Sequence, residues 1–366
     1  MKNAIKFGIA GAIAIAVIAS SGVISVPSLT LGTGLVAGGN DSSSTNIQTN
    51  DQKTLRIGYF PNINHAQAVI GLGRGDFQKA LGDNVEVTTQ IFSAGPSAIE
   101  SLFANQIDVA YIGPNPAING YVQSNGEALR IISGAASGGA VFVVRNDSGI
   151  NSAQDLANKK FSSPQLGNTQ DVALRKYLLD NGYNTKENGG NVEVIPAKNA
   201  DIVSLMIKKE IDGAWVPEPW GAKLIKEANA KVLVDERDLW PDRQFVTAHI
   251  IARTDYLESN PDVVKKLLEA HINETDWIND NPEEALQIFN TELDKITGKT
   301  IPEDEYREGI LRIELTYNPL KESLFKSAND AFDIGFLGKT RPDLSEIYDL
   351  RILNGVLKER GLQEIT

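Results

Sequence analysis

The chain has 366 residues, of which 42% are hydrophobic, and this is enough for two hydrophobic cores because domains usually span roughly 100–200 residues. Its formal net charge of −12 argues against a nucleic-acid backbone as partner, since that affinity rests on clustered Lys and Arg. Cysteine is absent. Disulfides, thiolate metal sites, a cysteine nucleophile and a lipid-modified N-terminal cysteine are therefore excluded.

The N-terminal segment has the order of features that is typical of an export signal. Lys2 and Lys6 precede an uncharged run that lasts until Asp41 and is most apolar from Phe7 to Val26. Because about 20 apolar residues can also span a bilayer, residues 1–38 are predicted to be either a cleaved signal peptide or a membrane anchor. Residues 39–53 are small and polar and predict a flexible tether. The folded part is then expected outside the cytoplasmic membrane, at the cell surface or in a periplasm.

Strand and helix patterns alternate from residue 55 onwards. The first half predicts strands over Leu55–Tyr59, Val85–Phe92 and Val109–Ile112, a helix over His65–Leu72, and two further strands within Ala128–Val144. The pattern Gly71-x-Gly73-x-Gly75 follows a helix rather than a strand, so we interpret it as a helix stop and not as a dinucleotide-binding fingerprint.

Two helix starts can be predicted from capping patterns. Ser97 and Glu100 have the spacing of a capping box. Asn115 is expected to be an N-cap, with Pro116 at the first helical position.

A second α/β pattern follows, and then a helical tail. Strands are predicted over Lys160–Ser162, Val192–Ile195, Lys231–Val234 and Phe245–Ala252, with helices over Val172–Asn181 and Ala200–Lys209. The tail predicts helices over Asp262–Asp280, Pro282–Leu293, Glu303–Leu315, Leu320–Phe332 and Ser345–Arg360. The run Asp235–Asp238 predicts a solvated charge cluster rather than a metal site, since no His stands nearby. Strands that alternate with helices indicate parallel sheets.

One stretch occurs twice in imperfect form. Ile107–Pro116 reads IDVAYIGPNP and Ile211–Trp220 reads IDGAWVPEPW. Each copy predicts a buried strand whose carboxyl end breaks into a turn, and ligands of open α/β sheets bind beyond such ends. We expect two lobes, with Gly113–Pro116 and Val216–Pro219 facing one cleft from opposite sides. Chance similarity between two ordinary strand ends is the alternative.

The chain resembles the extracytoplasmic solute-binding proteins of ABC importers for nitrate, taurine and aliphatic sulfonates. The resemblance covers roughly residues 55–268 and rests on four ordered motifs, LRIGYFPNINHAQA, SAGPSAIESLFANQIDVAYIGPNPAI, SPQLGNTQDVALRKYL and IDGAWVPEPW. It implies an α/β type II periplasmic-binding-protein fold, with two α/β lobes joined by two crossover strands and a helical C-terminal tail. Lobe one would comprise residues 54–142 and 248–366, and lobe two residues 143–247, with crossovers near Val141–Arg145 and Phe245–Ile250.

The resemblance also places four turns around the cleft, namely Asn62–His65, Gly95–Ser97, Pro114–Pro116 and Gly167–Gln170. Helix N-termini at such turns can bind an anion without a charged side chain. The ligand-binding residues predicted from these turns and their surroundings are Phe60, Asn62, His65, Gly95, Pro96, Ser97, Gly113, Pro114, Asn115, Ser137, Gly138, Asn168, Thr169, Gln170, Trp215, Glu218 and His249.

Three kinds of side chain in this set have a structural alternative. Trp215 has core packing as its alternative, since aromatic residues at a strand end are usually core residues, and a lone His is more often structural than functional. Glu218 would repel a simple anion but would pair with an ammonium group, which favours a zwitterion such as an aminosulfonate. His271 is expected on a surface helix without a role.

The function implied is a non-enzymatic receptor that presents a small oxoanion or zwitterion to a membrane permease and its ATPase. Aliphatic sulfonate or taurine is the preferred ligand, with nitrate, bicarbonate or a thiamine-type pyrimidine as alternatives. An enzyme on the same fold is the competing class, but the sequence offers no convincing catalytic set. No metal, cofactor or nucleic acid is expected, and the membrane is contacted through the N-terminal segment.

Overall fold

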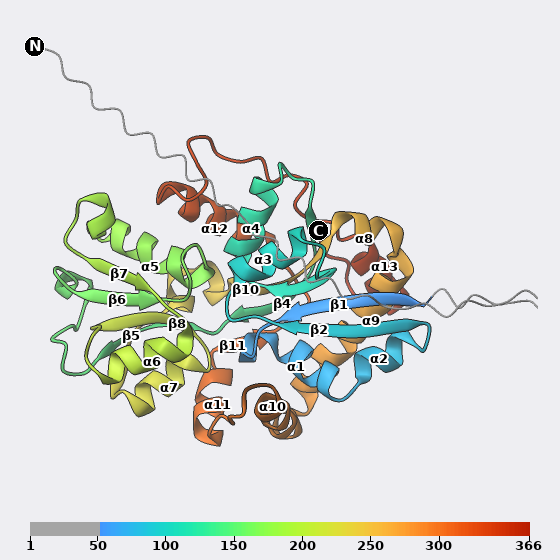
Figure 1. Cartoon of the computed structure of the whole chain (residues 1–366), viewed down its shortest axis with the longest axis horizontal. Coiled ribbons are helices and arrows are strands. Elements are labelled where there is room, and N and C mark those ends of the chain that lie inside the picture. Colours follow the sequence, from blue (N-terminus) through green and yellow to red (C-terminus); the bar gives the residue numbers. More distant parts are fainter. Residues whose placement is uncertain (1–51) are drawn as a thin grey trace, which may run out of the picture. The chain divides into compact units, whose positions relative to one another are not determined.

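The computed structural model describes residues 52–366, so the expected signal or anchor and nearly all of the expected tether lie outside the described residues. The described part contains two β-sheets with helices on both faces (Figure 1). We define lobe one as the six-stranded sheet with its helices, and lobe two as the five-stranded sheet with its helices. The predicted two-lobed α/β architecture is thereby confirmed.

The sheet of lobe one has the strand order β11-β4-β10-β3-β1-β2. Its strands are β1 Lys53–Tyr59, β2 Val85–Ile91, β3 Val109–Ile112, β4 Leu129–Gly138, β10 Val246–Arg253 and β11 Ile313–Leu315. β1 pairs in parallel with β2 and β3, whereas β10 runs antiparallel to β3 and β4. The sheet is therefore mixed, because parallel pairs are present as predicted but the strand that returns from lobe two runs antiparallel to its neighbours.

The sheet of lobe two has the order β7-β6-β8-β5-β9. Its strands are β5 Ala140–Arg145, β6 Lys160–Ser163, β7 Glu193–Pro196, β8 Gly213–Pro217 and β9 Ala230–Asp235. β6 is parallel to β7 and β8, and β5 is antiparallel to β8 and β9. The chain changes sheet between β4 and β5, a few residues before the expected boundary at 142, and returns between β9 and β10.

The helices begin mostly where the parallel strands end. They are α1 Ala66–Gly73, α2 Asp76–Leu81, α3 Gly95–Phe103, α4 Pro114–Gln123, α5 Thr169–Asp180, α6 Asn199–Ile207 and α7 Trp220–Glu227. The tail adds α8 Thr254–Ser259, α9 Pro261–Asp280, α10 Pro282–Thr297, α11 Glu303–Ile310, α12 Lys321–Asp333 and α13 Arg351–Glu359. Short 3₁₀ turns include η1 Ile63–His65 and η4 Glu236–Leu239.

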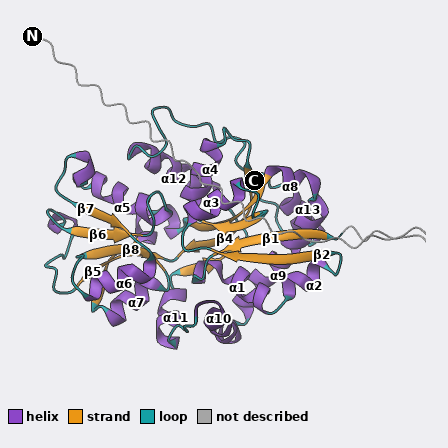
Figure 2. Ribbon diagram, viewed as in Figure 1, coloured by secondary structure: helices purple, strands orange, loops and turns teal. Residues whose placement is uncertain are grey.

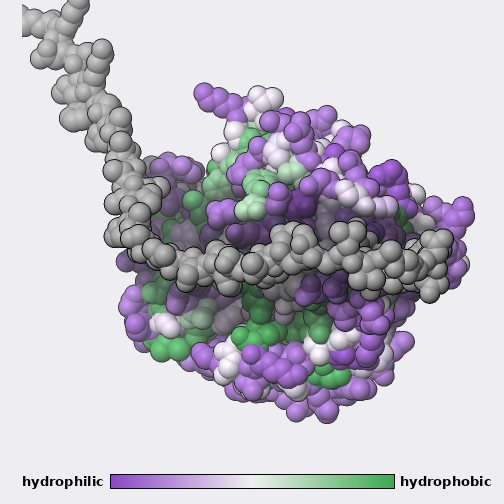
Figure 3. Space-filling model, turned by 45° about the vertical axis from the view of Figure 1, so that its right-hand side comes forward, coloured by the Kyte–Doolittle hydropathy of each residue, from purple (hydrophilic) through white to green (hydrophobic). Residues whose placement is uncertain are grey.

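Each face of each sheet buries its own hydrophobic cluster, because alternate side chains of a strand point to opposite faces. In β3, Val109 and Tyr111 join the cluster under α1, α9 and α10, whereas Ala110 and Ile112 join the one under α3, α4 and α12. The five-stranded sheet is likewise covered by α5 on one face and by α6 and α7 on the other (Figure 2). In Figure 3 most of the visible surface of the described residues is hydrophilic.

Several local predictions need correction. α3 is capped by Ala94, and the Ser97 hydroxyl donates to the Ala94 carbonyl instead of forming a capping box. α4 begins one proline earlier than expected, with Gly113 as N-cap and Pro114 at the first position. Either proline suits the first turn, because its missing N–H is not needed there.

Two parts of the tail also differ from the prediction. The expected helix over 303–315 ends at Ile310, because Ile313–Leu315 pairs with β4 as an edge strand. The last helix begins at Arg351 rather than at 345. Local propensity is overridden in the first case by a long-range strand pairing.

His271 is buried rather than exposed, in the interior face of α9. Its Nε2 faces the Gly134 carbonyl at 2.9 Å and must donate, so its Nδ1 accepts from the Tyr111 hydroxyl at 3.0 Å. Burial lowers the pKa of His271 to about 4, and the ring is therefore neutral at physiological pH.

The charge run Asp235–Asp238 is not uniformly solvated. The Glu236 side chain is buried, and its carboxylate accepts a hydrogen bond from Trp215 Nε1 at 2.6 Å. Burial raises the pKa of Glu236 to about 7, although this hydrogen bond lowers it. A folded-state pKa above the unfolded value means that folding favours the protonated form, so stability is lost as pH rises from about 4.5 through 7.

We therefore expect Glu236→Gln, which mimics the protonated acid and keeps an acceptor for Trp215, to remove this loss. At pH 5 the variant and the parent protein should unfold with similar free energies. At pH 8 the variant should be more stable, by at most about 3 kcal/mol. Urea unfolding at both pH values measures the difference, and a constant offset across this range would show that Glu236 does not titrate there.

Candidate functional site

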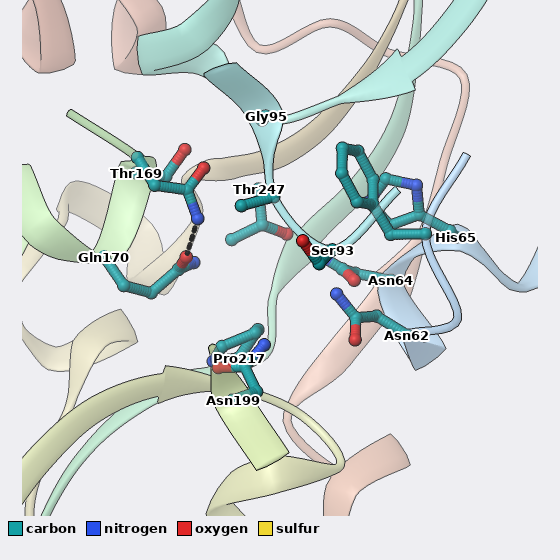
Figure 4. Close-up of a pocket in the computed structure, with 14 residues that line it drawn as sticks. Asn62, Asn64, His65, Ser93, Gly95, Thr169, Gln170, Asn199, Pro217 and Thr247 are labelled. Atoms are coloured by element: carbon teal, nitrogen blue, oxygen red, sulfur yellow. Dashed lines mark hydrogen bonds between the residues drawn. The ribbon is translucent and has the colours of Figure 1, made fainter. Parts of the chain in front are cut away.

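A polar cavity lies between the two lobes, where the carboxyl ends of their parallel strands face each other. Its volume is about 30 Å³. Lobe one contributes η1, the turns before α3 and α4, and the start of β10, and lobe two contributes the starts of α5 and α6 and the end of β8 (Figure 4). The lining residues are Phe60, Asn62, Asn64, His65, Ser93, Ala94, Gly95, Gly113, Asn168, Thr169, Gln170, Asn199, Pro217 and Thr247.

Helix N-termini from both lobes reach this cavity. The lining includes the N-caps of α3, α4 and α5, which are Ala94, Gly113 and Asn168, and the first residue of α6, Asn199. None of the four helices has a side-chain hydrogen bond from its N-cap to the first turn. The cavity wall therefore presents the positive ends of four helix dipoles and the first-turn N–H groups that have no partner within a helix. The number of these donors is reduced by prolines in the first turns of α3 and α4, and Asp171 N and Asp201 N already donate to the N-cap carbonyls of α5 and α6.

Four buried side-chain atoms of the lining residues have no hydrogen-bond partner in the described part of the chain. They are Asn64 Oδ1, His65 Nδ1, Thr169 Oγ1 and Asn199 Oδ1, and each of these residues is at most 8% exposed. An unpaired buried polar atom is costly. A half turn of either Asn carboxamide would present its NH₂ group instead, so this set can donate several hydrogen bonds to a bound molecule.

His65 is a neutral group in this cavity. Burial lowers its pKa to about 3. Its ring packs edge-on against Phe60, with centroids 4.8 Å apart. The imidazole can therefore donate or accept a hydrogen bond, but it adds no positive charge at physiological pH.

The cavity has no charged side chain among its lining residues. Asp171, an acid on α5, is buried and has a structural role. Its carboxylate accepts hydrogen bonds from Ser163 Oγ at 2.7 Å, Gly167 N at 2.9 Å and Arg175 Nε at 3.0 Å. These bonds fix the turn that carries Asn168, Thr169 and Gln170.

Two glycines of lobe one lie close to lobe two at the cavity. A Cβ atom at Gly113 of lobe one would lie 2.3 Å from the Thr169 hydroxyl oxygen of lobe two. A Cβ atom at Gly95 would lie 3.1 Å from Asn168 Oδ1. The first distance is too short for a real Cβ contact, so glycine at position 113 permits the observed approach of the lobes. The second distance is tight but allowed, and a Cβ at Gly95 would first collide with Pro116 Cγ of lobe one, at 2.2 Å.

The cavity brings together part of the predicted ligand-binding set. Its lining includes eight of these residues, namely Phe60, Asn62, His65, Gly95, Gly113, Asn168, Thr169 and Gln170. Four others, Pro96, Ser97, Pro114 and Asn115, lie in the first turns of α3 and α4 but do not line the cavity. Asn115 Nδ2 instead donates to the Ser327 carbonyl of α12 at 3.2 Å.

The remaining predicted residues serve the fold. Trp215 is buried in the core of lobe two, where it stacks on Phe142 with centroids 5.2 Å apart. His249 Nε2 bonds to the Pro319 carbonyl at 2.8 Å. Ser137 Oγ accepts from Phe245 N at 3.3 Å, and Gly138 is the last residue of β4 with φ +73°, beside the first change of sheet.

The expectation for Glu218 is wrong. Glu218 is fully buried outside the cavity lining. Its Oε1 accepts from Arg312 Nη1 at 2.7 Å, and its Oε2 accepts from Ala222 N at 3.0 Å. Its charge is therefore already paired within the protein, and no ammonium group is needed to balance it.

Sequence reasoning missed Ser93, Ala94, Asn199 and Thr247 as lining residues, whereas Asn64 and Pro217 lie in segments that it placed at the cleft without naming these residues singly. Asn199 begins a helix directly after a predicted strand, which is the same signal that found Thr169. Thr247 lies on a strand with no turn signal, and only the pairing of β10 beside β3 and β4 brings it to the cavity.

Comparisons with known proteins agree with this geometry. The family described as NMT1-like matches residues 48–291. A protein of Brucella abortus (strain 2308) that is named a binding protein is 26% identical over 266 residues, which cover 70% of this chain and 79% of the relative. An aliphatic sulfonates-binding protein of Bacillus subtilis (strain 168) is 23% identical, over 88% of this chain and 93% of the relative.

Solved structures show the same fold. The alkanesulfonate-binding protein SsuA from Xanthomonas axonopodis pv. citri, bound to MOPS, matches with a TM-score of 0.68 and 16% identity, over 81% of this chain and 98% of that one. The periplasmic nitrate-binding protein NrtA from Synechocystis PCC 6803 matches with a TM-score of 0.67 and 17% identity, over 84% and 89%. Both are periplasmic-binding-protein structures, which confirms the predicted fold class.

We expect Gly113→Ala to hold the lobes apart, because its methyl group would collide with Thr169. The backbone of Gly113 has φ −70°, which alanine adopts freely, so lobe one itself should fold normally. Small-angle X-ray scattering should show a larger radius of gyration for the variant. Gly355→Ala is the matched control, since a Cβ at that helical position meets no atom within 4 Å. An unchanged radius for Gly113→Ala would mean that the lobes do not approach this closely in solution.

Proposed function

This chain belongs to the NMT1-like family, and we propose that it is an extracytoplasmic solute-binding receptor of an ABC importer. It captures a small oxoanion between its lobes and delivers it to a membrane permease and its ATPase. The observation that carries this proposal is the convergence of four helix N-termini on an uncharged cavity with unpartnered polar side chains.

An oxoanion fits this cavity on physical grounds. Its oxygens accept hydrogen bonds from several first-turn N–H groups at once, and each such charge-assisted bond contributes roughly 1.5–3 kcal/mol. The donors are fixed by the helices, so little ordering is required when the ligand binds. A cation would meet the positive ends of the helix dipoles and no carboxylate among the lining residues.

An aliphatic sulfonate without an amine is the ligand that we favour. The relative from Bacillus subtilis carries a sulfonate name, and a sulfonate head group offers three acceptor oxygens. Taurine also has an ammonium group, for which the lining residues provide no acidic partner. The pairing of Glu218 with Arg312 therefore shifts the preference from taurine to plain alkanesulfonates.

Nitrate is the second candidate, and the size of the cavity favours it. A cavity needs a volume of about 10–15 Å³ to hold one water molecule. The cavity of about 30 Å³ therefore has room for a small anion but not for a long alkyl tail. An alkanesulfonate would require the lobes to open further around its tail than they do here.

A binding role is also more consistent with the lining than an enzymatic one. Ser93 and His65 both line the cavity, but no hydrogen bond joins them in the described part of the chain. A nucleophile needs an adjacent base within hydrogen-bond reach. We therefore assign no catalytic step to this protein.

We also propose that the N-terminal segment exports the protein or anchors it to the membrane. Among its helices, none has both the length and the apolar character that crossing a bilayer demands. The proposed export signal or anchor lies in residues 1–38, and fractionation of cells that express the full chain tests it. Recovery of the intact protein from the cytosol would contradict the proposed location.

The ligand can be tested by thermal unfolding of residues 52–366 with 1-propanesulfonate, nitrate and taurine. A ligand at about 100 times its Kd stabilises the folded state by about 2.7 kcal/mol. We expect stabilisation by 1-propanesulfonate or nitrate and a weaker effect of taurine. Stabilisation by taurine alone would overturn the argument from the uncharged lining, and no response to any oxoanion would overturn the proposal.

Thr169→Val tests the donor set directly. The substitution keeps the shape but removes a buried hydroxyl, which has no partner in the described residues and lines the cavity. We expect about a tenfold loss of affinity for the anion, equivalent to about 1.4 kcal/mol, measured by calorimetry. Thr185→Val is the matched control, because the Thr185 hydroxyl is also buried without a partner but lies outside the cavity lining. Equal losses in both variants would point to a general effect on folding.

A further inference from the structure

The segment Glu303–Arg312, which we call the clasp segment, belongs to the C-terminal tail but reaches lobe two. It comprises α11 and the turn that leads into β11. Its anchor in lobe one is Tyr306, whose ring packs against Phe289 of α10 with centroids 5.5 Å apart. Figure 1 shows α11 beside the junction of the two sheets.

The strongest contact of the clasp segment with lobe two is a buried ion pair. Arg312 Nη1 donates to Glu218 Oε1 at 2.7 Å, and Arg312 Nη2 donates to Glu308 Oε1 at 2.8 Å. The Glu218 side chain is completely buried and that of Arg312 is 14% exposed. These residues are far apart in sequence, and the pair exists only because the two lobes meet.

Weaker contacts surround this pair. Lys226 of α7 pairs with Asp304 at 2.6 Å, and Arg237 Nη1 donates to the Leu311 carbonyl at 3.1 Å. Both are partly solvated and contribute little by themselves. A Cβ at Gly309 would lie 3.3 Å from the Glu218 Cβ, so the helix backbone closes over the carboxylate and excludes water from it.

The ion pair lies next to the cavity without entering it. Glu218 directly follows Pro217, which lines the cavity. The Glu218 carbonyl accepts from Ile63 N at 3.4 Å, and Trp220 Nε1 donates to Asn62 Oδ1 at 3.0 Å. The same strand-to-helix turn of lobe two therefore touches both the clasp segment and η1. This 3₁₀ turn and its N-cap supply Asn62, Asn64 and His65 to the cavity.

Electrostatics couple this ion pair to lobe closure. Burial raises the pKa of Glu218, whereas the hydrogen bond from Ala222 N and the charge of Arg312 lower it. A buried carboxylate that loses its partner is strongly unfavourable. Without Arg312, the protein would relieve that cost by opening the lobes and hydrating Glu218, and an open cleft separates the donors that bind the anion.

We propose that the Glu218–Arg312 pair holds the two lobes closed, and that Arg312 is a positioning residue that sets ligand affinity without touching the ligand. The effect on affinity rests on the proposed receptor function, whereas the effect on lobe closure does not. The apparent affinity equals the affinity of the closed state multiplied by the fraction of molecules that are closed.

The test measures lobe separation and affinity in the same set of variants. Because the chain has no cysteine, Glu86→Cys in lobe one and Lys208→Cys in lobe two, both exposed, accept a pair of spin labels for distance measurement. We expect Arg312→Met to shift the distance distribution of the ligand-free protein to longer values. We also expect it to weaken binding of 1-propanesulfonate or nitrate at least tenfold.

The double variant Glu218→Gln/Arg312→Met removes both charges and keeps an acceptor for Ala222 N. It should return the distance distribution toward that of the parent and recover most of the lost affinity, which a merely damaged lobe would not do. Arg56→Met is the control inside lobe one, because it removes one arginine partner of the buried Asp108, whose second partner Arg253 lies 3.4 Å away. It should lower stability but leave the lobe separation unchanged.

The outcomes separate the two proposals. An unchanged distance distribution in Arg312→Met, or the same widening in Arg56→Met, would overturn the role of the ion pair. Failure of the parent protein to bind either anion would overturn the receptor proposal. The spin-label distances would still show whether the ion pair holds the lobes closed. Should Arg312→Met not fold, Arg312→Lys replaces it, and an intermediate widening is then the supporting result because one ammonium cannot bridge both carboxylates as the guanidinium does.

Discussion

The cavity depends on one property of the α-helix, namely that the N–H groups of its first turn have no partner within the helix. In a βα unit the helix starts at the carboxyl end of its strand, so the unsatisfied donors of several helices gather at one edge of a parallel sheet. Here two sheets present such edges to each other, and Gly113 and Thr169 meet across the gap. Anion binding then requires no charged side chain at the cavity.

Charged residues nevertheless control the geometry around the cavity. Asp171 with Arg175 fixes the turn at the start of α5, and Glu218 with Arg312 joins the lobes next to the cavity-lining residue Pro217. In both cases a buried carboxylate is balanced by an arginine inside the protein and contributes no net charge to the cavity. Because these carboxylates are paired outside the cavity, the cavity stays attractive to an anion although the whole chain carries a net charge of −12.

The C-terminal tail does more than cover one face of lobe one. α11 contacts α7 of lobe two, and on the other side of the junction α12 packs against both α4 and α5. In Figure 1 the two helices lie on opposite sides of the place where the sheets meet. The relative position of the lobes is thus set by tail contacts as well as by the two crossings of the chain, which makes the tail a part of the binding apparatus.

The sequence by itself determined the elements that depend on local patterns. Alternating apolar residues predicted the strands, and polar turns such as Asn168–Gln170 predicted helix starts at the cavity, because periodicity and capping act over a few residues. Only the tertiary structure decided what distant residues do to one another. No local pattern indicates a partner for Glu218, but in the fold its charge is paired with Arg312. Thr247 reaches the cavity through strand pairing alone. Such contacts join residues that lie far apart in the sequence, so no local pattern can predict them. The role of a side chain therefore depends on tertiary contacts and not only on the secondary structure that carries it.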